Sequence, residues 1–321
     1  MKKTFLFTIL FTVFALAACT DSQQQLSRRA ALLCQYVPDH QLKEQSQDYM
    51  TKDFYTLLDT MFNHLPEYEE VAHEWIYYFV TGNGGTIADF EVKQVEKTDD
   101  THALATILVR QKWEDGSFDP TTDIEEHRLY MEKMDGEWLM SDFDEHKQDC
   151  IRYIAICRQE QAVRDAISDY LTNYIGSQYL QGEVCIPTII IVAAEELSPS
   201  DDDSTMTADS AVIFGDFWID WFNISGDTLY LVSGGNHSGR MTLVQHNEKP
   251  QVTAFEQTVD GAGNTESAMR IFGEHYDVYH NIHSNQDVRE ACRKLQIIDY
   301  VRRKHMNIHY YQDFGREAVE L

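Results

Sequence analysis

Polar and apolar residues alternate in four successive runs between residues 87 and 144, and this alternation constrains the fold more than any other feature of the sequence. Alternation places every second side chain on one face, which is typical of half-buried β-strands. Asp135-Gly136, between the last two runs, predicts a tight hairpin, because both turn positions require a positive φ. An antiparallel meander with one apolar face is therefore expected. The runs cover residues 87–97, 101–113, 125–134 and 136–144.

Two helices are predicted ahead of this meander. Residues 52–65 carry apolar side chains at helical spacing, residues 67–80 form a second candidate helix, and Pro66 separates the two. Such a helix pair can cover the apolar face of a sheet. We therefore predict an α+β domain over residues 27–156.

The hairpin segment RLYMEKMDGEWLMSDF, residues 128–143, resembles the last two strands of the nuclear transport factor 2-like (NTF2-like) family. The matching features are a lysine, an Asp-Gly turn, a tryptophan and a closing Asp-Phe pair. The resemblance implies a cone-shaped fold in which a curved sheet wraps helices around a pocket, near Trp75, Tyr78 or Trp113. Enzymes of this fold use differing sets of aspartate, tyrosine and histidine, and no such set can be matched here. The resemblance therefore implies no catalytic residue.

A helix, a sheet and further helices are predicted in the second half of the chain. Residues 158–175 carry apolar side chains every three or four positions, as one face of a helix does. Residues 157–321 are predicted to form a second α+β domain with a curved antiparallel sheet. Its strands are expected at residues 182–197, 210–224, 227–233, 239–246 and 251–259. Its later helices are expected at residues 265–273 and 286–305, the last with an apolar face of Val288, Ala291, Cys292, Leu295 and Ile298.

The start of the chain has the pattern of a bacterial lipoprotein signal. Two lysines precede an apolar run that is too short to span a bilayer, and Leu16-Ala17-Ala18-Cys19 resembles a lipobox. The resemblance implies a signal peptide over residues 1–18, acyl chains such as palmitate on Cys19, and a polar tether over residues 19–26. We therefore expect a lipoprotein of the cell envelope, held on a membrane by its lipid.

Residues 215–243 and 272–280 resemble a domain of uncharacterised lipoproteins of Bacteroidota, in which a Gly-Asp-aromatic-Trp strand leads to a Ser-Gly-Gly-x-His loop. This resemblance implies no activity. Surface-exported lipoproteins of those bacteria carry an acidic, lysine-containing run after the cysteine, and Thr20-Asp21-Ser22-Gln23 departs from it. The departure favours the outer membrane, on its periplasmic side.

The net charge and the motifs of the sequence limit the partners and cofactors that we expect. The chain has 26 basic and 53 acidic residues, a net charge of −27, and such a field repels nucleic acid. The zincin pattern begun by His73-Glu74 lacks its second histidine, because Tyr77 stands at that position. The pairs His280/His283 and His305/His309 are expected to be solvated. We predict no metal and no cofactor, and the expected partner is an unknown small molecule or an envelope protein.

Five cysteines remain beyond Cys19, and an odd number cannot all pair within one chain. No C-x-x-C occurs, which excludes zinc-ribbon and thioredoxin-like chemistry. Buried free thiols are the preferred interpretation, and the disulfide state stays open. The five are Cys34, Cys150, Cys157, Cys185 and Cys292.

The candidate ligand contacts are Asp216, Trp218, His237 and Arg240. Asp216 and Trp218 share one face of an aromatic strand, where the indole could stack on a sugar or an apolar ligand, or pack against a helix. Asp216 and Asp220 could alternatively act as an acid–base pair. His237 and Arg240 lie in LVSGGNHSGRM, residues 231–241, whose glycines we expect to form a wide turn with positive φ. This turn is either structural or ligand-contacting, catalysis by Ser238 is the least favoured interpretation, and we assign no catalytic residue.

These patterns together predict a membrane-anchored module that binds a ligand or another protein. Two alternatives stay open. The chain could be an envelope enzyme with a pocket in one domain, or an inhibitor or immunity-type lipoprotein whose acidic surface meets a basic partner. A fold does not fix a function, so the choice depends on the site.

Overall fold

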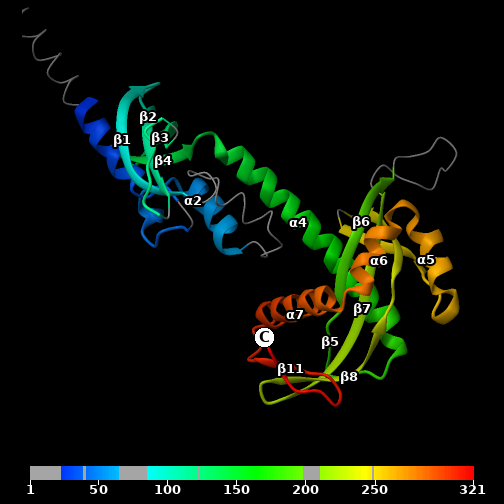
Figure 1. The fold of residues 1–321 in the computed structure, drawn as a ribbon. Helices are drawn as coiled ribbons and strands as arrows, with labels where there is room; N and C mark the ends of the chain where they lie inside the picture. The colour runs from blue at the N-terminus through cyan, green and yellow to red at the C-terminus, as the bar shows by residue number, and fades with distance from the viewer. Residues whose placement is uncertain are drawn as a thin grey trace, which may run out of the picture. The chain divides into compact units, whose positions relative to one another are not determined.

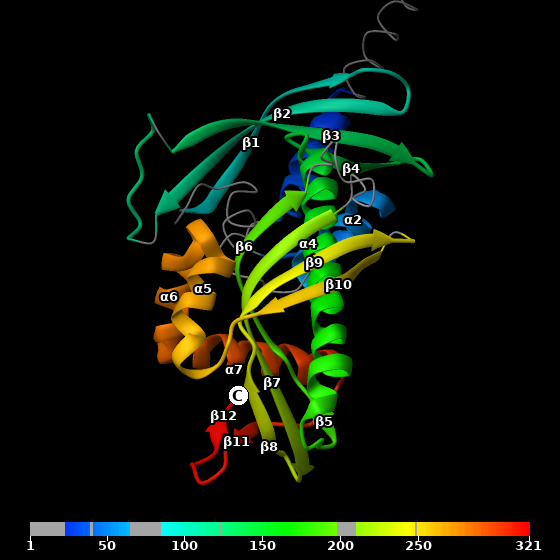
Figure 2. The same cartoon turned by 90° about the vertical axis from the view of Figure 1, so that its right-hand side faces the viewer.

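The computed structural model describes residues 23–38, 41–64, 85–113, 115–121, 123–197, 210–247 and 249–321. These residues form two compact units, and the boundary between Cys157 and Arg158 lies within helix α4 (His146–Tyr170). In each unit a largely antiparallel sheet packs against helices, which confirms the predicted α+β class (Figures 1 and 2). The sequence indicates α4 only from residue 158, because Ile151 and Ile156 in its first turns face solvent.

The first unit contains the predicted meander. Its strands pair antiparallel in the order β1-β2-β3-β4, and the Asp135-Gly136 turn has φ values of 50° and 92°. Every second residue of β2 is buried, as its alternation predicts. An extra residue, Ala88, bulges from β1 opposite β2 and bends that strand. The strands are β1 (Gly85–Lys97), β2 (His102–Trp113), β3 (Ile124–Met134) and β4 (Glu137–Phe143).

Helices cover one face of this sheet. They comprise a helix over residues 23–34, η1 (Ser46–Asp48), α2 (Lys52–Asp59) and the π-helical turn η2 (Thr60–His64). Phe54 and Leu58 of α2 are fully buried in the shared core. The second predicted helix, residues 67–80 with Trp75 and Tyr78, lies outside the described residues. This helix-on-sheet arrangement is the one that the NTF2-like resemblance implies.

Residues 23–26, which the sequence places in a polar tether, form the first described turn of a helix. Leu26 is 5% exposed and belongs to the core, and the Gln23 side chain donates to the Val95 carbonyl oxygen at 2.7 Å. A packed first turn excludes a free linker over these four residues. The apolar spacing of Leu26, Ala30 and Leu33 was the available signal, and the polar run before Leu26 obscured the helical character of residues 23–26.

The second unit is built around one long strand, β7 (Ser210–Ser225). Along one edge of β7 lie β5 (Val184–Cys185) and β6 (Thr188–Leu197), where a single strand was predicted. Pro187 lies between β5 and β6, because it has no backbone N–H to donate to a hydrogen bond of the sheet. The other strands are β8 (Thr228–Asn236), β9 (Gly239–His246), β10 (Lys249–Gln257), β11 (Tyr310–Gln312) and β12 (Val319–Glu320).

β8 and β9 follow one another along the same edge of β7. Trp218 pairs with Asn236 and Gly215 pairs with Gly239, so the register of β8 continues unchanged into β9. The His237 backbone N–H donates to the Phe217 carbonyl oxygen at 2.7 Å within the gap. Residues 231–241 are therefore the middle of one long antiparallel strand, and the predicted wide turn between two strands is wrong.

Helices cover both faces of this second sheet (Figures 1 and 2). The end of α4 and the turns η3 (Leu171–Ile175) and η4 (Gly176–Gln178) pack on the face that carries Phe217 and Ile219. The opposite face, with Phe214 and Phe222, packs against later helices. These are α5 (Asn264–Phe272), α6 (Tyr276–Ser284) and α7 (Gln286–Arg303), with the short turns η5 (Gly261–Gly263) and η6 (Gly273–His275).

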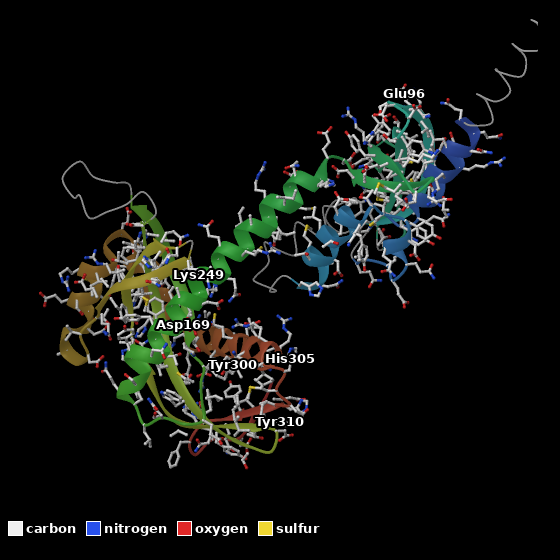
Figure 3. All side chains as sticks on the ribbon, turned by 180° about the vertical axis from the view of Figure 1, so that it is seen from behind. Glu96, Asp169, Lys249, Tyr300, His305 and Tyr310 are labelled. Carbon is white, nitrogen blue, oxygen red and sulfur yellow. The ribbon has the colours of Figure 1, made fainter. Side chains whose placement is uncertain are left out.

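The predicted inner face of α7 is wrong. Leu295 is 64% exposed and Val288 is 39% exposed, whereas Arg293, Ile297 and Val301 are buried. Tyr300 also packs on this inner cluster, and Figure 3 shows it on α7 across from the segment that carries Tyr310. Because Arg293 points inward, the buried face of α7 differs from the apolar face that the spacing of hydrophobic residues predicts.

All five described cysteines are free thiols, and four are buried. Burial raises the pKa of Cys34 and Cys150 to about 12 and that of Cys185 to about 11. Thiols of such high pKa are poor nucleophiles. None of the helices in the described parts of the chain combines the length and the hydropathy of a membrane-spanning segment.

Candidate functional site

The four candidate ligand residues lie in three separate places of the second unit. Asp216 and Trp218 are on the face of β7 that α6 and α7 cover. His237 contacts the segment that follows α4, on the opposite face. The exposed Arg240 side chain lies on β9, beside Glu256 of β10. The structure therefore brings two of the four together and separates the others.

Asp216 connects three segments. The Ser238 hydroxyl donates to its carboxylate at 2.6 Å, the Asn236 amide donates to the same oxygen, and His283 Nδ1 of α6 lies 3.3 Å from both oxygens. Ser238 stands directly opposite Asp216 in the continued register of β7 and β8–β9. The carboxylate thus holds α6 onto the sheet.

Electrostatics favour a charged Asp216. Burial by itself would raise the pKa of Asp216, but the hydrogen bonds from His283, Ser238 and Asn236 outweigh it and hold this pKa below its usual range. In a nucleophilic triad the histidine lies between serine and aspartate. Here the aspartate lies in the middle and Ser238 is 0% exposed, so the cluster has the geometry of a structural lock.

Trp218 is covered by α7. The Arg289 guanidinium lies 5.0 Å from the centre of the Trp218 ring, a distance typical of a cation–π contact. Thr188 is the cross-strand neighbour of Trp218, and the Trp218 indole N–H and the Thr188 hydroxyl are buried with no hydrogen-bond partner in the described part of the chain. One ring face is therefore already occupied, as the alternative of helix packing requires.

Asp220 belongs to a buried ion-pair network with α7 and the C-terminal segment. Arg293 Nε donates to Asp220 at 2.8 Å, and its two terminal nitrogens hold Asp313 at 2.8 and 2.9 Å. Burial raises the pKa of Asp220 to about 6, and Arg293 opposes that rise. The Asp216–Asp220 pair does have divergent pKa values, but each carboxylate is fully engaged by its own partners.

His237 and Arg240 make contacts that support the sheet. His237 Nε2 lies 2.8 Å from the Tyr179 hydroxyl and Nδ1 lies 2.8 Å from Gln257 Oε1. Arg240 pairs with Glu256 at 2.8 Å, and Arg270 of α5 contacts the same carboxylate. Both side chains therefore join neighbouring elements.

The glycines of residues 231–241 are needed for close approach. A Cβ atom at Gly235 would lie 2.2 Å from the Tyr179 hydroxyl, and one at Gly239 would lie 2.1 Å from the Glu256 carbonyl oxygen. None of the three glycines has a positive φ. The expected positive φ is therefore wrong, and the physical reason for glycine is contact with neighbouring backbone and side chains.

A groove beside the edge strand of the first unit has the size of a ligand site. Its volume is about 730 Å³, within the range of small-molecule pockets. Val37, Ile87 and Phe90 supply apolar surface. We call it the β1 groove, and its lining residues are Ala31, Gln35, Val37, Gln41, Lys43, Ile87, Ala88, Asp89 and Phe90.

The two charged residues that line the β1 groove differ in their partners. Asp89 is paired with Arg110 of β2 at 2.7 Å. The Lys43 ammonium donates to the Gln35 carbonyl oxygen and forms no ion pair with a carboxylate among the described residues. The groove therefore offers one cation beside an apolar surface.

The sequence did not predict the helical residues that contact Asp216, Trp218 and Asp220 of β7. Tyr279 and His283 come from α6, which was not predicted, and Arg289 and Arg293 lie on α7 outside its apolar stripe. Aromatic residues at 276, 279 and 283 have helical spacing and were the available signal for α6. No local pattern marks the β1 groove, because its walls are distant in sequence.

Comparisons with known proteins add little. No known family model matches the sequence, and no curated protein matches it. Among solved structures, a chain described as "Ntf2 like protein involved in plasmid conjugation" is 11% identical. That match covers 73% of this chain and 99% of the other, with a TM-score of 0.20. A likeness this low carries no argument about function.

Proposed function

We propose that the protein is a lipid-anchored ligand-binding module of the bacterial cell envelope, and that the β1 groove holds the ligand. The groove carries this proposal, because it combines a volume of about 730 Å³ with apolar side chains and a cation that no carboxylate of the described residues engages. The lipobox resemblance around Cys19 supports the anchor, and the NTF2-like resemblance of the first unit supports a ligand pocket.

The lining favours an amphipathic ligand with an anionic group. Val37, Ile87 and Phe90 suit a hydrocarbon or ring surface, while Lys43 suits a carboxylate, sulfonate or phosphate. Binding is favoured over catalysis, because Asp89 is held by Arg110, Lys43 donates to a backbone carbonyl, and the lining includes no serine, cysteine or histidine.

Filling the groove tests the site. Ala31 is exposed on the helix over residues 23–34 and lines the groove. We expect Ala31→Trp to weaken binding of 8-anilinonaphthalene-1-sulfonate at least about tenfold, a loss near 1.4 kcal/mol, because the indole occupies the space of the aromatic body. Lys43→Gln should weaken binding by removing the partner of the sulfonate. Fluorescence titration of the full chain measures both effects.

Ala155→Trp is the matched control, since Ala155 is also an exposed helical residue but does not line the groove. It should bind the dye like the unaltered chain. Native mass spectrometry of protein extracted from its own membranes should show a co-purified molecule that Ala31→Trp removes. Equal binding by Ala31→Trp and Ala155→Trp would overturn the groove as the site.

The anchor has its own test. We expect Cys19→Ala to abolish incorporation of labelled palmitate, because the thiol at position 19 is the only atom to which the lipobox resemblance assigns the lipid. Cys292→Ala, at a partly exposed cysteine of the second unit, should leave labelling unchanged. Persistent labelling of Cys19→Ala would show that the acyl chain is attached elsewhere or that the lipobox interpretation is wrong.

A further inference from the structure

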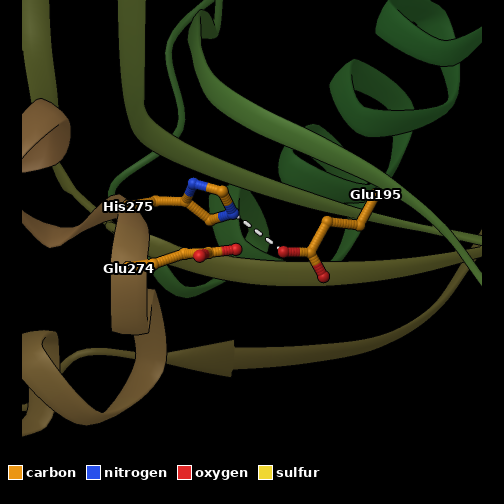
Figure 4. Close-up of side chains that lie close together, drawn as sticks. All are labelled: Glu195, Glu274 and His275. Atoms are coloured by element: carbon orange, nitrogen blue, oxygen red, sulfur yellow. Dashed lines mark hydrogen bonds and ion pairs between the residues drawn. The ribbon is translucent and has the colours of Figure 1, made fainter.

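We propose that Glu195, Glu274 and His275 bind a divalent transition metal ion, with Zn²⁺ as the expected occupant. Each residue offers one ligand atom, and the three atoms lie within 4.8 Å of one another. Figure 4 shows the two carboxylates and the imidazole pointing toward a common point. The site lies in the second unit and is independent of the β1 groove.

The ligand atoms come from two elements that are distant in sequence. Glu195 is on β6, while Glu274 and His275 are consecutive residues of η6. Zn–O and Zn–N bonds of about 2.0–2.2 Å in a tetrahedron separate ligand atoms by about 3.4 Å. Exposed glutamate side chains can close the remaining distance by rotamer adjustment, so the backbone need not move.

The backbone conformation at the start of η6 directs this turn toward β6. Gly273, the first residue of η6 and the residue directly after α5, has φ 52° and ψ −121°, a conformation in which L side chains are strained. The His275 ring packs on Phe214 of β7 with 5.0 Å between ring centres. This contact orients Nε2 toward Glu195, whose carboxylate oxygen lies 2.8 Å away.

Charge also favours a cation at this point. Within the described part of the chain, neither Glu195 nor Glu274 forms an ion pair with a lysine or an arginine. Two carboxylates therefore converge on a single imidazole in a chain of net charge −27. A divalent ion would offset their mutual repulsion and accept the imidazole nitrogen lone pair.

The donor set selects the class of metal. Imidazole nitrogen with carboxylate oxygens suits Zn²⁺ and its neighbours in the first transition row, whereas Ca²⁺ and Mg²⁺ prefer oxygen ligands alone. Three protein ligands leave a coordination position for water. Because the two glutamates are exposed, we expect weaker Zn²⁺ binding than at a closed structural site with four protein ligands.

Isothermal titration of the full chain with ZnCl₂ tests the proposal. We expect the unaltered chain to bind Zn²⁺ at this site, and Glu195→Gln, Glu274→Gln and His275→Asn each to weaken that binding at least about tenfold. The glutamine variants keep the shape of the side chain and remove only its charge. Zn²⁺ should also raise the melting temperature of the second unit, and this rise should disappear in Glu274→Gln.

Other exposed histidines provide the background for this measurement. His246→Asn and Glu266→Gln are matched controls at exposed positions outside the cluster, and both should bind Zn²⁺ like the unaltered chain. Binding that survives in all three cluster variants would assign Zn²⁺ to other surface groups and overturn the proposal. Equal affinity for Ca²⁺ and Zn²⁺ would overturn the role of the imidazole nitrogen.

Discussion

Replacing Arg293 with methionine is expected to lower the free energy of unfolding of the second unit by about 3–5 kcal/mol. Methionine keeps the aliphatic part of the side chain but removes the charge that Asp220 and Asp313 share. Arg293 is 9% exposed and Asp220 is 6% exposed. The change therefore leaves two carboxylates facing each other with little access to water, and α7 and β11 lose their common anchor on β7.

The loss should depend on pH. Burial raises the pKa of Asp220 to about 6, so the folded protein binds this proton more tightly than the unfolded chain does. The contribution of Asp220 to stability is thus fully present below the unfolded pKa, about 3.9, and is lost as pH rises through about 6. Without Arg293 the carboxylate is harder to ionise. We therefore expect a larger defect in Arg293→Met at pH 8 than at pH 5.5.

Hydrogen exchange of β7 amides measures the stability of this unit in the full chain. Arg303→Met is the matched control, because the Arg303 side chain is 48% exposed while it pairs with Asp299 and Asp165. An exposed pair of this kind contributes below about 1 kcal/mol. Equal losses in the two variants, or a defect that does not change with pH, would contradict the buried network.

This network also shows where sequence reasoning succeeds and fails. Alternation predicted β2 well, because a half-buried strand places every second side chain in the core. The buried face of α7 was predicted wrongly, because hydrophobic spacing cannot register an arginine that is buried by its ion partners. Asp220 and Asp313 are 93 positions apart, and no local pattern reveals that they share one guanidinium.

The candidate site was predictable to a similar degree. Asp216 and Trp218 were placed correctly on one strand face, since period-two geometry follows from the sequence. His283 and Arg289, which contact them, come from helices whose docking depends on tertiary packing. The β1 groove and the Glu195 cluster likewise join segments distant in sequence. Composition and periodicity describe elements, whereas sites form where elements meet.

Gly239→Ala is expected to destabilise the second unit by about 3 kcal/mol. The added Cβ would lie 2.1 Å from the Glu256 carbonyl oxygen and 3.0 Å from Gln257 Cα. Neither backbone atom can move without separating β10 from β9, because Glu256 and Gln257 pair with Arg240 and Gly239 in the ladder between these strands. Hydrogen exchange of β9 and β10 amides should show the loss directly, because these two strands must shift first.

Asparagine distinguishes this cause from a turn that requires positive φ. Gly226 has φ 63° and open space around its Cβ position, so Gly226→Ala should cost about 1–2 kcal/mol, and Gly226→Asn should recover part of that loss because asparagine tolerates the left-handed region. At position 239 asparagine should be at least as harmful as alanine, since its side chain also begins with the colliding Cβ. Recovery of stability by Gly239→Asn would support a turn with positive φ at this position and contradict the continuous β8–β9 strand.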